Sequence, residues 1–256
     1  MRGQRWTFQE LKLAFYLYCQ LPFGRLHARD PEIIDLANML GRTASSVAMK
    51  LVNFASLDPA ITSTGRKGLS GASRLDREIW DAFHADWEGL ADGCAAITLD
   101  RTVLAEPTVA EMPGGYYVGE TRAALVQQRV RQQFFRRAVL SSYRGRCCMS
   151  GLNEPALLLA SHIKPWREDR ANRLNPANGL CLSALHDKAF DQGLISVSPE
   201  YTVIVSPRLA KSAQPFVAKM FSELHSRPLE LPERFVPDPA FLAWHRANIF
   251  VESLAK

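Results

Sequence analysis

The sequence predicts an α+β protein, with a helical N-terminal domain followed by a domain of short strands and helices. Within residues 1–90, helix-start signals precede apolar residues at helical spacing. Within residues 156–197, short apolar runs alternate with polar stretches in the order strand, loop, strand, helix. A Pro- and Gly-containing stretch without helical periodicity separates them, so we expect domains at 1–90 and 122–256 and a linker at 91–121.

The N-terminal domain is expected to contain four helices. Polar capping residues and proline are favoured where helices begin, and glycine where they end. The signals are Thr7 and Glu10 at capping-box spacing, the pair Asp30-Pro31, the stop at Gly41 and the cap at Thr43, with a fourth helix from about Leu75 to Leu90.

The short turn at Gly41-Arg42 has the length found in a helix-turn-helix, which suggests that the third helix contacts DNA. The candidate contacts on that helix are Ser45, Ser46, Lys50 and Asn53. The phrase from Leu40 to Val47 resembles DNA-binding domains of the Myb-like and winged-helix kind. The alternative is a helical bundle that only packs on the rest of the protein.

Residues 121–153 contain seven arginines and no acidic residue, in a chain with a formal net charge of +5. Such a segment forms a positive surface that suits phosphates. The alternative is a solvated helix face that acids elsewhere neutralise. The residues expected to contact DNA here are Arg129, Arg131, Arg136 and Arg137.

Composition excludes other classes of protein. No apolar run approaches 18 residues and the N-terminus lacks an apolar signal stretch, so we expect a cytoplasmic protein without a membrane span. The five cysteines are irregularly spaced and form no CxxC motif. This argues against a disulfide framework and a four-cysteine zinc site, and indicates buried thiols.

Three polar residues lie at the junctions of the predicted C-terminal elements. His162 ends the strand Leu157–Ile163, Asn178 begins the strand that runs to Leu182, and His186 lies on a helix that Ser183 can cap. That helix is expected to stop near Gly193, and a further strand follows at residues 194–197.

These residues and their order resemble the HNH (ββα-metal) endonuclease family, specifically its restriction-like members. The matching segments are Ala160 to Trp166, Asn175 to Leu180 and Leu185 to Ile195. The resemblance covers residues 122–250, and the lead-in from Arg136 to Gly151 also fits it. It implies a metal-dependent DNA endonuclease that leaves 5′-phosphate and 3′-hydroxyl ends, with a restriction-like role that extends to modified DNA.

The chemistry of phosphodiester hydrolysis is consistent with these residue types. A neutral imidazole can take a proton from water, so we expect His162 to be the general base. A divalent cation can polarise the phosphate and stabilise the leaving oxygen. We expect His186 to bind this cation, and Asn178 either to orient the base or to join the metal. Lys164 and Arg167 follow the base and are candidate DNA contacts.

One position departs from the family pattern. Many members place Asp or His directly before the general base, where this chain has Ser161. Asp187 and Asp191 are the nearest carboxylates on the helix, and we expect Asp191 to complete the metal shell. Oxygen ligands with one imidazole favour Mg²⁺ or Mn²⁺.

Two other classes of protein remain open at this stage. A DNA-binding regulator that has lost catalysis would use the N-terminal helix-turn-helix, and Ser161 is its best support. A structural zinc module would need more clustered thiols than this chain has. The expected partner is double-stranded DNA, and a palindromic target would require a homodimer.

Overall fold

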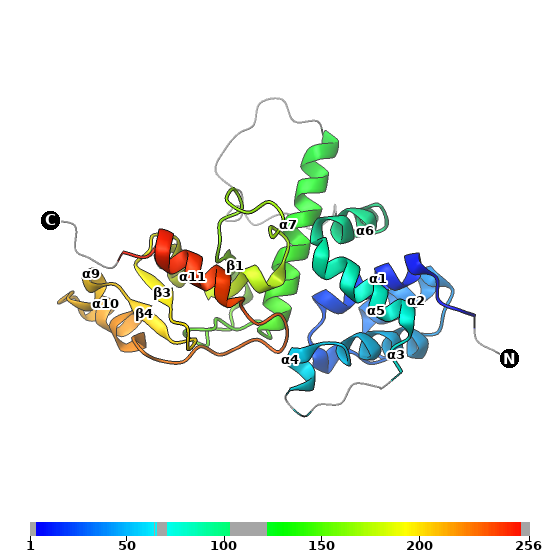
Figure 1. Ribbon diagram of the computed structural model, residues 1–256, viewed down its shortest axis with the longest axis horizontal. Coiled ribbons are helices and arrows are strands. Elements are labelled where there is room, and N and C mark those ends of the chain that lie inside the picture. The colour runs from blue at the N-terminus through cyan, green and yellow to red at the C-terminus, as the bar shows by residue number, and fades with distance from the viewer. Residues whose placement is uncertain (1–3, 64, 66–70, 103–121, 252–256) are drawn as a thin grey trace. The chain divides into compact units, whose positions relative to one another are not determined.

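The computed structural model describes residues 4–63, 65, 71–102 and 122–251 (Figure 1). The chain divides into two compact units, Met1–Ser141 and Ser142–Lys256. Most of the expected linker, residues 103–121, lies outside the described residues. None of the described helices is long and apolar enough to cross a membrane.

The described part of the first unit is helical, as predicted. Thr7 and Glu10 form the expected capping box, Asp30 and Thr43 cap the next two long helices, and Gly41 adopts a left-handed conformation (φ 62°) between them. The helices are α1 (Phe8–Gln20), the 3₁₀ turn Phe23–Arg25, α2 (Pro31–Leu40), α3 (Ala44–Ala55), α4 (Pro59–Thr62), α5 (Arg74–Ala85), α6 (Trp87–Thr102) and α7 (Arg122–Ser142).

Two expectations about this unit need correction. The predicted fourth helix is interrupted at Asp86, and α6 continues to Thr102, beyond the start of the expected linker at residue 91. The Arg-rich helix α7 belongs to the first unit and not to the second domain. The reason is its packing, because Phe134 stacks on Tyr16 of α1 and Arg131 forms an ion pair with Asp92 of α6.

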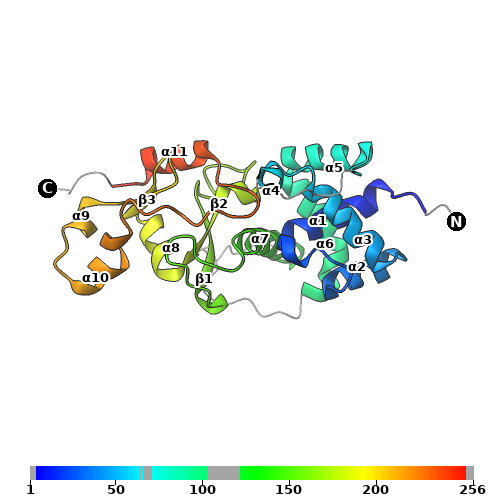
Figure 2. The ribbon, with the colours of Figure 1, turned by 90° about the horizontal axis from the view of Figure 1, so that it is seen from below.

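The second unit begins with an antiparallel hairpin and a helix. Strand β1 (Leu158–His162) pairs with β2 (Gly179–Ser183) in a register that places His162 opposite Gly179. Helix α8 (Ala184–Asp191) follows β2 directly and contacts both strands (Figure 2). This confirms the predicted order of strand, loop, strand and helix.

A second strand pair and several short helices complete this unit. Strand β3 (Ile195–Val197), predicted from the sequence, pairs with β4 (Val203–Val205). The remaining elements are two 3₁₀ turns at Pro155–Leu157 and Pro176–Asn178, α9 (Pro207–Ala210), α10 (Pro215–Met220), a 3₁₀ turn at Ser222–Leu224 and α11 (Pro239–Asn248).

His245 of α11 packs in the core of this unit and contacts α8 and β3. Its ring stacks on Phe190 of α8 with centroids 3.7 Å apart, and its Nε2 donates to the Phe190 carbonyl at 3.1 Å. Its Nδ1 lies 2.9 Å from the Ser196 hydroxyl on β3. A buried histidine with partners on both nitrogens stabilises the packing and is not exposed to a substrate.

Candidate active site

His162 lies at the end of β1 with one nitrogen held by the backbone. Its Nε2 is 2.9 Å from the carbonyl oxygen of Arg173, and because a carbonyl can only accept, Nε2 carries the proton. In the neutral ring Nδ1 is then the basic nitrogen. Burial lowers the pKa of His162 to about 4, although the Arg173 carbonyl opposes this shift. The ring is therefore neutral near pH 7, as a general base must be.

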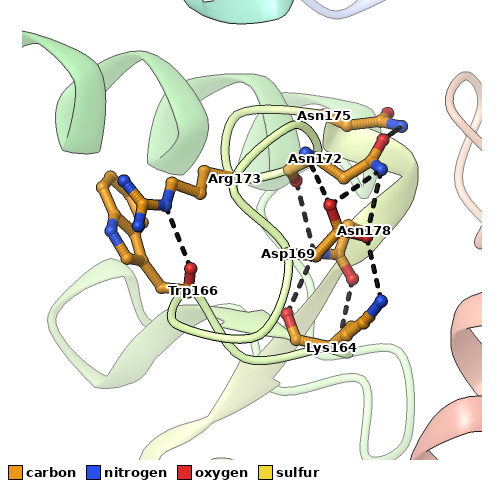
Figure 3. A network of polar contacts seen from close by, with 7 residues as sticks. All are labelled: Lys164, Trp166, Asp169, Asn172, Arg173, Asn175 and Asn178. Atoms are coloured by element: carbon orange, nitrogen blue, oxygen red, sulfur yellow. Dashed lines mark hydrogen bonds and ion pairs between the residues drawn. The ribbon is translucent and has the colours of Figure 1, made fainter.

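Asn178 holds the loop between β1 and β2 (Figure 3). Its Oδ1 accepts from the Lys164 N–H at 2.8 Å, and its Nδ2 donates to the carbonyls of Lys164 at 3.0 Å and Asn172 at 3.3 Å. The side chain is 1% exposed. An amide satisfied in this way by backbone groups orients the loop, which favours the positioning role over the metal shell among the two roles expected of Asn178.

His186 does not have the environment expected of a metal ligand. It is 3% exposed, its Nε2 lies 3.1 Å from the Met220 carbonyl, and its Nδ1 lies 2.9 Å from Ser183 Oγ and 3.6 Å from Cys147 Sγ. Both ring nitrogens therefore have protein partners. The physical reason is that His186 faces the inside of the unit, where it ties α8 to Cys147 and to the end of α10.

The contact between Cys147 and His186 perturbs both groups. Burial acts to raise the pKa of the Cys147 thiol, but hydrogen bonds from His186 and Ser150 outweigh it and lower the pKa to about 6. Burial acts to lower the pKa of His186, and the contacts with Cys147 and Met220 raise it overall. These shifts describe a mutually stabilised buried pair.

Two carboxylates one helical turn apart on α8 have the properties of cation ligands. Burial raises the pKa of Asp187. Desolvation by the surrounding protein raises the pKa of Asp191 to about 6 although the residue is exposed, and the negative charge of Asp187 adds to that shift. Carboxylates whose ionisation is disfavoured by desolvation, and for Asp191 also by the charge of Asp187, are stabilised by a nearby cation.

Ser161, the residue before the general base, borders this carboxylate pair. Its hydroxyl lowers the pKa of Asp187, so the two groups are close. It is 3% exposed, and Ser161 Oγ has no hydrogen bond of standard geometry among the described residues. A buried oxygen without such a bond next to a destabilised carboxylate is consistent with a cation at this place.

The spacing of the helix residues favours Asp187 as a further candidate ligand beside Asp191. Residues four apart lie on the same face of a helix, whereas residues five apart lie roughly 140° apart around it. Asp187 and Asp191 satisfy the first spacing, and His186 and Asp191 the second. Asp187 therefore lies on the same face of α8 as Asp191, whereas His186 lies on a different face.

The two basic side chains that follow His162 differ in how exposed they are and in how fully other residues already bind them. Lys164 Nζ is 3.1 Å from the Asp169 carboxylate and 5.7 Å from the centre of the Trp244 ring. Its ammonium group therefore stabilises the loop between β1 and β2. The Arg167 side chain is 84% exposed, and within the part of the chain that the structure describes its ion pair is with Glu168, at 3.2 Å. Of the two, Arg167 is better placed to meet a phosphate.

The arginines of the first unit also differ, because some are bound by acidic residues and Arg129 is exposed. Arg129 is exposed and Arg136 is half-buried. Arg131 is bound by both oxygens of Asp92, and Arg137 pairs with Glu32. Acids within the same unit thus neutralise part of the Arg-rich segment.

The expected DNA contact at Lys50 is not supported. Its Nζ lies 3.0 Å from each carboxylate oxygen of Asp76, and the residue is 8% exposed. Asn53 is also buried, whereas Ser45 is exposed. The surface of α3 that remains open includes Met49, which is 55% exposed, so this helix lacks the basic face expected of a DNA reader.

A hairpin and a following helix, with a histidine ending the first strand and carboxylates on the helix, form the arrangement that the ββα-metal resemblance predicted. Residues 147–198 match the family model described as HNH endonuclease, and this segment is an HNH endonuclease domain. The match includes both strands of the hairpin, α8 and β3.

A solved structure described as "Modification dependent TagI restriction endonuclease" is similar to this chain, with 21% sequence identity and a TM-score of 0.34. The similarity covers 46% of this chain and 39% of that one, so this chain spans less than half of that protein's length. No curated protein matches the chain.

Proposed function

We propose that this protein is a metal-dependent DNA endonuclease that hydrolyses phosphodiester bonds to 5′-phosphate and 3′-hydroxyl ends. The observation that carries the proposal is the state of His162, a neutral imidazole whose Nε2 is committed to the Arg173 carbonyl. This leaves Nδ1 as the nitrogen that takes the proton of the attacking water.

The residues on α8 fit the divalent cation that the family implies. Asp187 and Asp191 would hold it, with the Ser161 hydroxyl beside them, and these hard oxygen donors suit Mg²⁺ or Mn²⁺. When bound, the cation would supply charge stabilisation of the phosphate and of the leaving oxygen. This replaces the ligand set of His186, Asn178 and Asp191 that we expected from the sequence.

The finer proposal is a restriction-like role against double-stranded DNA, with modified DNA among the substrates. It rests on the family resemblance of the HNH segment. The regulator without catalysis is less favoured, because Lys50 and Asn53 of its DNA-contacting helix are buried.

Cleavage of supercoiled plasmid tests the proposal. The wild-type protein should nick or linearise plasmid with Mg²⁺ or Mn²⁺ and not with EDTA, on methylated or unmethylated DNA, and ligase should reseal the products because they carry 5′-phosphates. Absence of metal-dependent cleavage on every such substrate would refute the nuclease assignment and return the regulator as the leading alternative.

A further inference from the structure

The loop between β1 and β2 is organised around a single carboxylate (Figure 3). Asp169 accepts from Lys164 Nζ at 3.1 Å, from the Asn172 backbone N–H at 3.2 Å and from Asn172 Nδ2 at 3.2 and 3.1 Å. Burial acts to raise the pKa of Asp169, but these hydrogen bonds outweigh it and lower the pKa overall. Asp169 is thus an ionised carboxylate that fixes Asn172 through both its backbone and its side chain.

Asn172 connects this carboxylate to the rest of the loop. Its carbonyl accepts from Asn178 Nδ2 at 3.3 Å, and its Oδ1 accepts from Asn175 Nδ2 at 3.0 Å. The next residue is Arg173, whose carbonyl receives the proton of His162 Nε2. Fixing the Asn172 peptide therefore fixes the direction of the carbonyl that the general base meets.

The side chain of Arg173 is held from the other end of the loop. Its Nε donates to the Trp166 carbonyl at 3.0 Å, and its guanidinium lies 5.0 Å from the centre of the Trp166 ring. That ring in turn meets the His162 ring edge to face, at 5.8 Å. Asp169 and Trp166 thus restrain the two sides of the residue that contacts the base.

We infer that Asp169 is a positioning residue: through Asn172 it holds the Arg173 carbonyl against His162 Nε2 and so keeps the proton on Nε2 and the basic nitrogen at Nδ1. The inference rests on the proposed function only for its catalytic consequence. A carboxylate is required at this position because three donors converge on it and an amide would direct its own N–H groups at them.

The test measures the tautomer of His162 and the rate of cleavage in the full-length protein. Nitrogen NMR of ¹⁵N-imidazole-labelled protein at pH 7 should show a proton on Nε2 in the wild type. In Asp169→Ala, and to a smaller degree in Asp169→Asn, the ring should sample both tautomers. Single-turnover cleavage should then slow roughly 10- to 100-fold, with DNA affinity unchanged, because the base is misplaced and not lost.

Glu168→Gln is the matched control, because Glu168 is the neighbouring carboxylate and, among the described residues, its ion pair is with Arg167 and not with the partners of Asp169. It should keep both the tautomer and the rate. Retention of the Nε2 proton in both Asp169 variants would overturn the inference, whatever their rate. If the wild type cleaves no DNA, the proposed function fails, while the tautomer measurement still decides whether Asp169 positions His162.

Discussion

At the scale of single residues, neighbouring side chains on one helix have different tasks. His186 is buried among Ser183, Cys147 and Met220. Asp187 is half-buried near Ser161, and Asp191 on the same helix is exposed. We therefore propose that the histidine contributes to stability and that the two carboxylates bind the cation.

Asp187→Asn should weaken binding of Mn²⁺ by at least roughly tenfold, the lower end of the loss that even an outer-shell partner causes. The reason is that an amide removes one negative charge from the site while keeping the shape of the side chain. Calorimetric titration of the protein with Mn²⁺ measures the effect. Glu168→Gln removes a carboxylate from the same unit and should leave the affinity unchanged, and an Asp187→Asn variant with wild-type affinity would contradict the assignment.

His186→Gln should instead lower the free energy of unfolding of the second unit by about 1 to 3 kcal/mol, the cost of leaving buried partners unsatisfied. Its Mn²⁺ affinity should stay that of the wild type. Chemical denaturation with the same titration gives both quantities. Loss of Mn²⁺ affinity with unchanged stability would restore His186 as a metal ligand.

At the scale of elements, local patterns predicted the helices and strands well. Capping residues at Thr7, Asp30 and Thr43 act within three residues of themselves, so the starts of α1, α2 and α3 could be deduced from neighbouring positions. The strands β1 and β2 were predicted from short apolar runs, and the start of α8 from its capping residue Ser183. The linker was expected from residue 91, but its first proline comes only at Pro107, and α6 continues to Thr102.

Contacts between distant residues could not be deduced in this way. The stacking of Phe134 on Tyr16 and the pairing of Lys50 with Asp76 join segments far apart in sequence. Local patterns do not contain these contacts, so the sequence predicts α7 in the second domain and Lys50 on a DNA-facing surface, whereas the structure has α7 in the first unit and Lys50 buried. The site was predicted in part: the position of His162 followed from the motif, but the direction of each side chain on α8 did not.

The attachment of α11 through His245 should make the second unit sensitive to acid. Burial lowers the pKa of His245 in the folded protein to about 4 from an ordinary value of 6.5. Between these values the unfolded chain binds the additional proton, so the stabilisation is present above pH 6.5 and is lost as the pH falls to 4. This shift corresponds to about 3 kcal/mol.

Hydrogen exchange of the β3 amides, corrected for intrinsic rates, measures this pH dependence locally, because Ser196 on β3 contacts His245. His245→Gln removes the titrating group and should flatten the dependence between pH 6.5 and 4, although His162 retains its own contribution. If the exchange rates of the wild type and of His245→Gln depended equally on pH, protonation of His245 would not be the cause of the acid sensitivity.

At the scale of the whole molecule, acidic residues neutralise some of the arginines that the sequence suggested as DNA contacts. The chain has a formal net charge of +5. Arg131 and Arg137 are already paired with acids of the first unit, whereas Arg129 is exposed. Attraction to DNA should therefore depend on a subset of the arginines that the sequence suggested.

Arg129→Ala should reduce the dependence of DNA affinity on salt concentration by about one in the logarithmic slope, the effect of losing one phosphate contact. Arg131→Ala should leave the slope unchanged, because Asp92 already occupies its guanidinium. Fluorescence anisotropy with a labelled duplex at several KCl concentrations measures both slopes. An equal reduction in both variants would show that the ion pair opens on binding DNA.

The central claim is that His162 acts as the general base of a metal-dependent DNA cleavage. The most direct measurement is the single-turnover rate of plasmid cleavage by the wild type and by His162→Ala, at saturating Mn²⁺ and equal DNA occupancy. We expect metal-dependent cleavage by the wild type and a rate at least roughly 100-fold lower in the variant, because the variant lacks the general base. Equal rates in the two proteins, or no cleavage by the wild type, would contradict it.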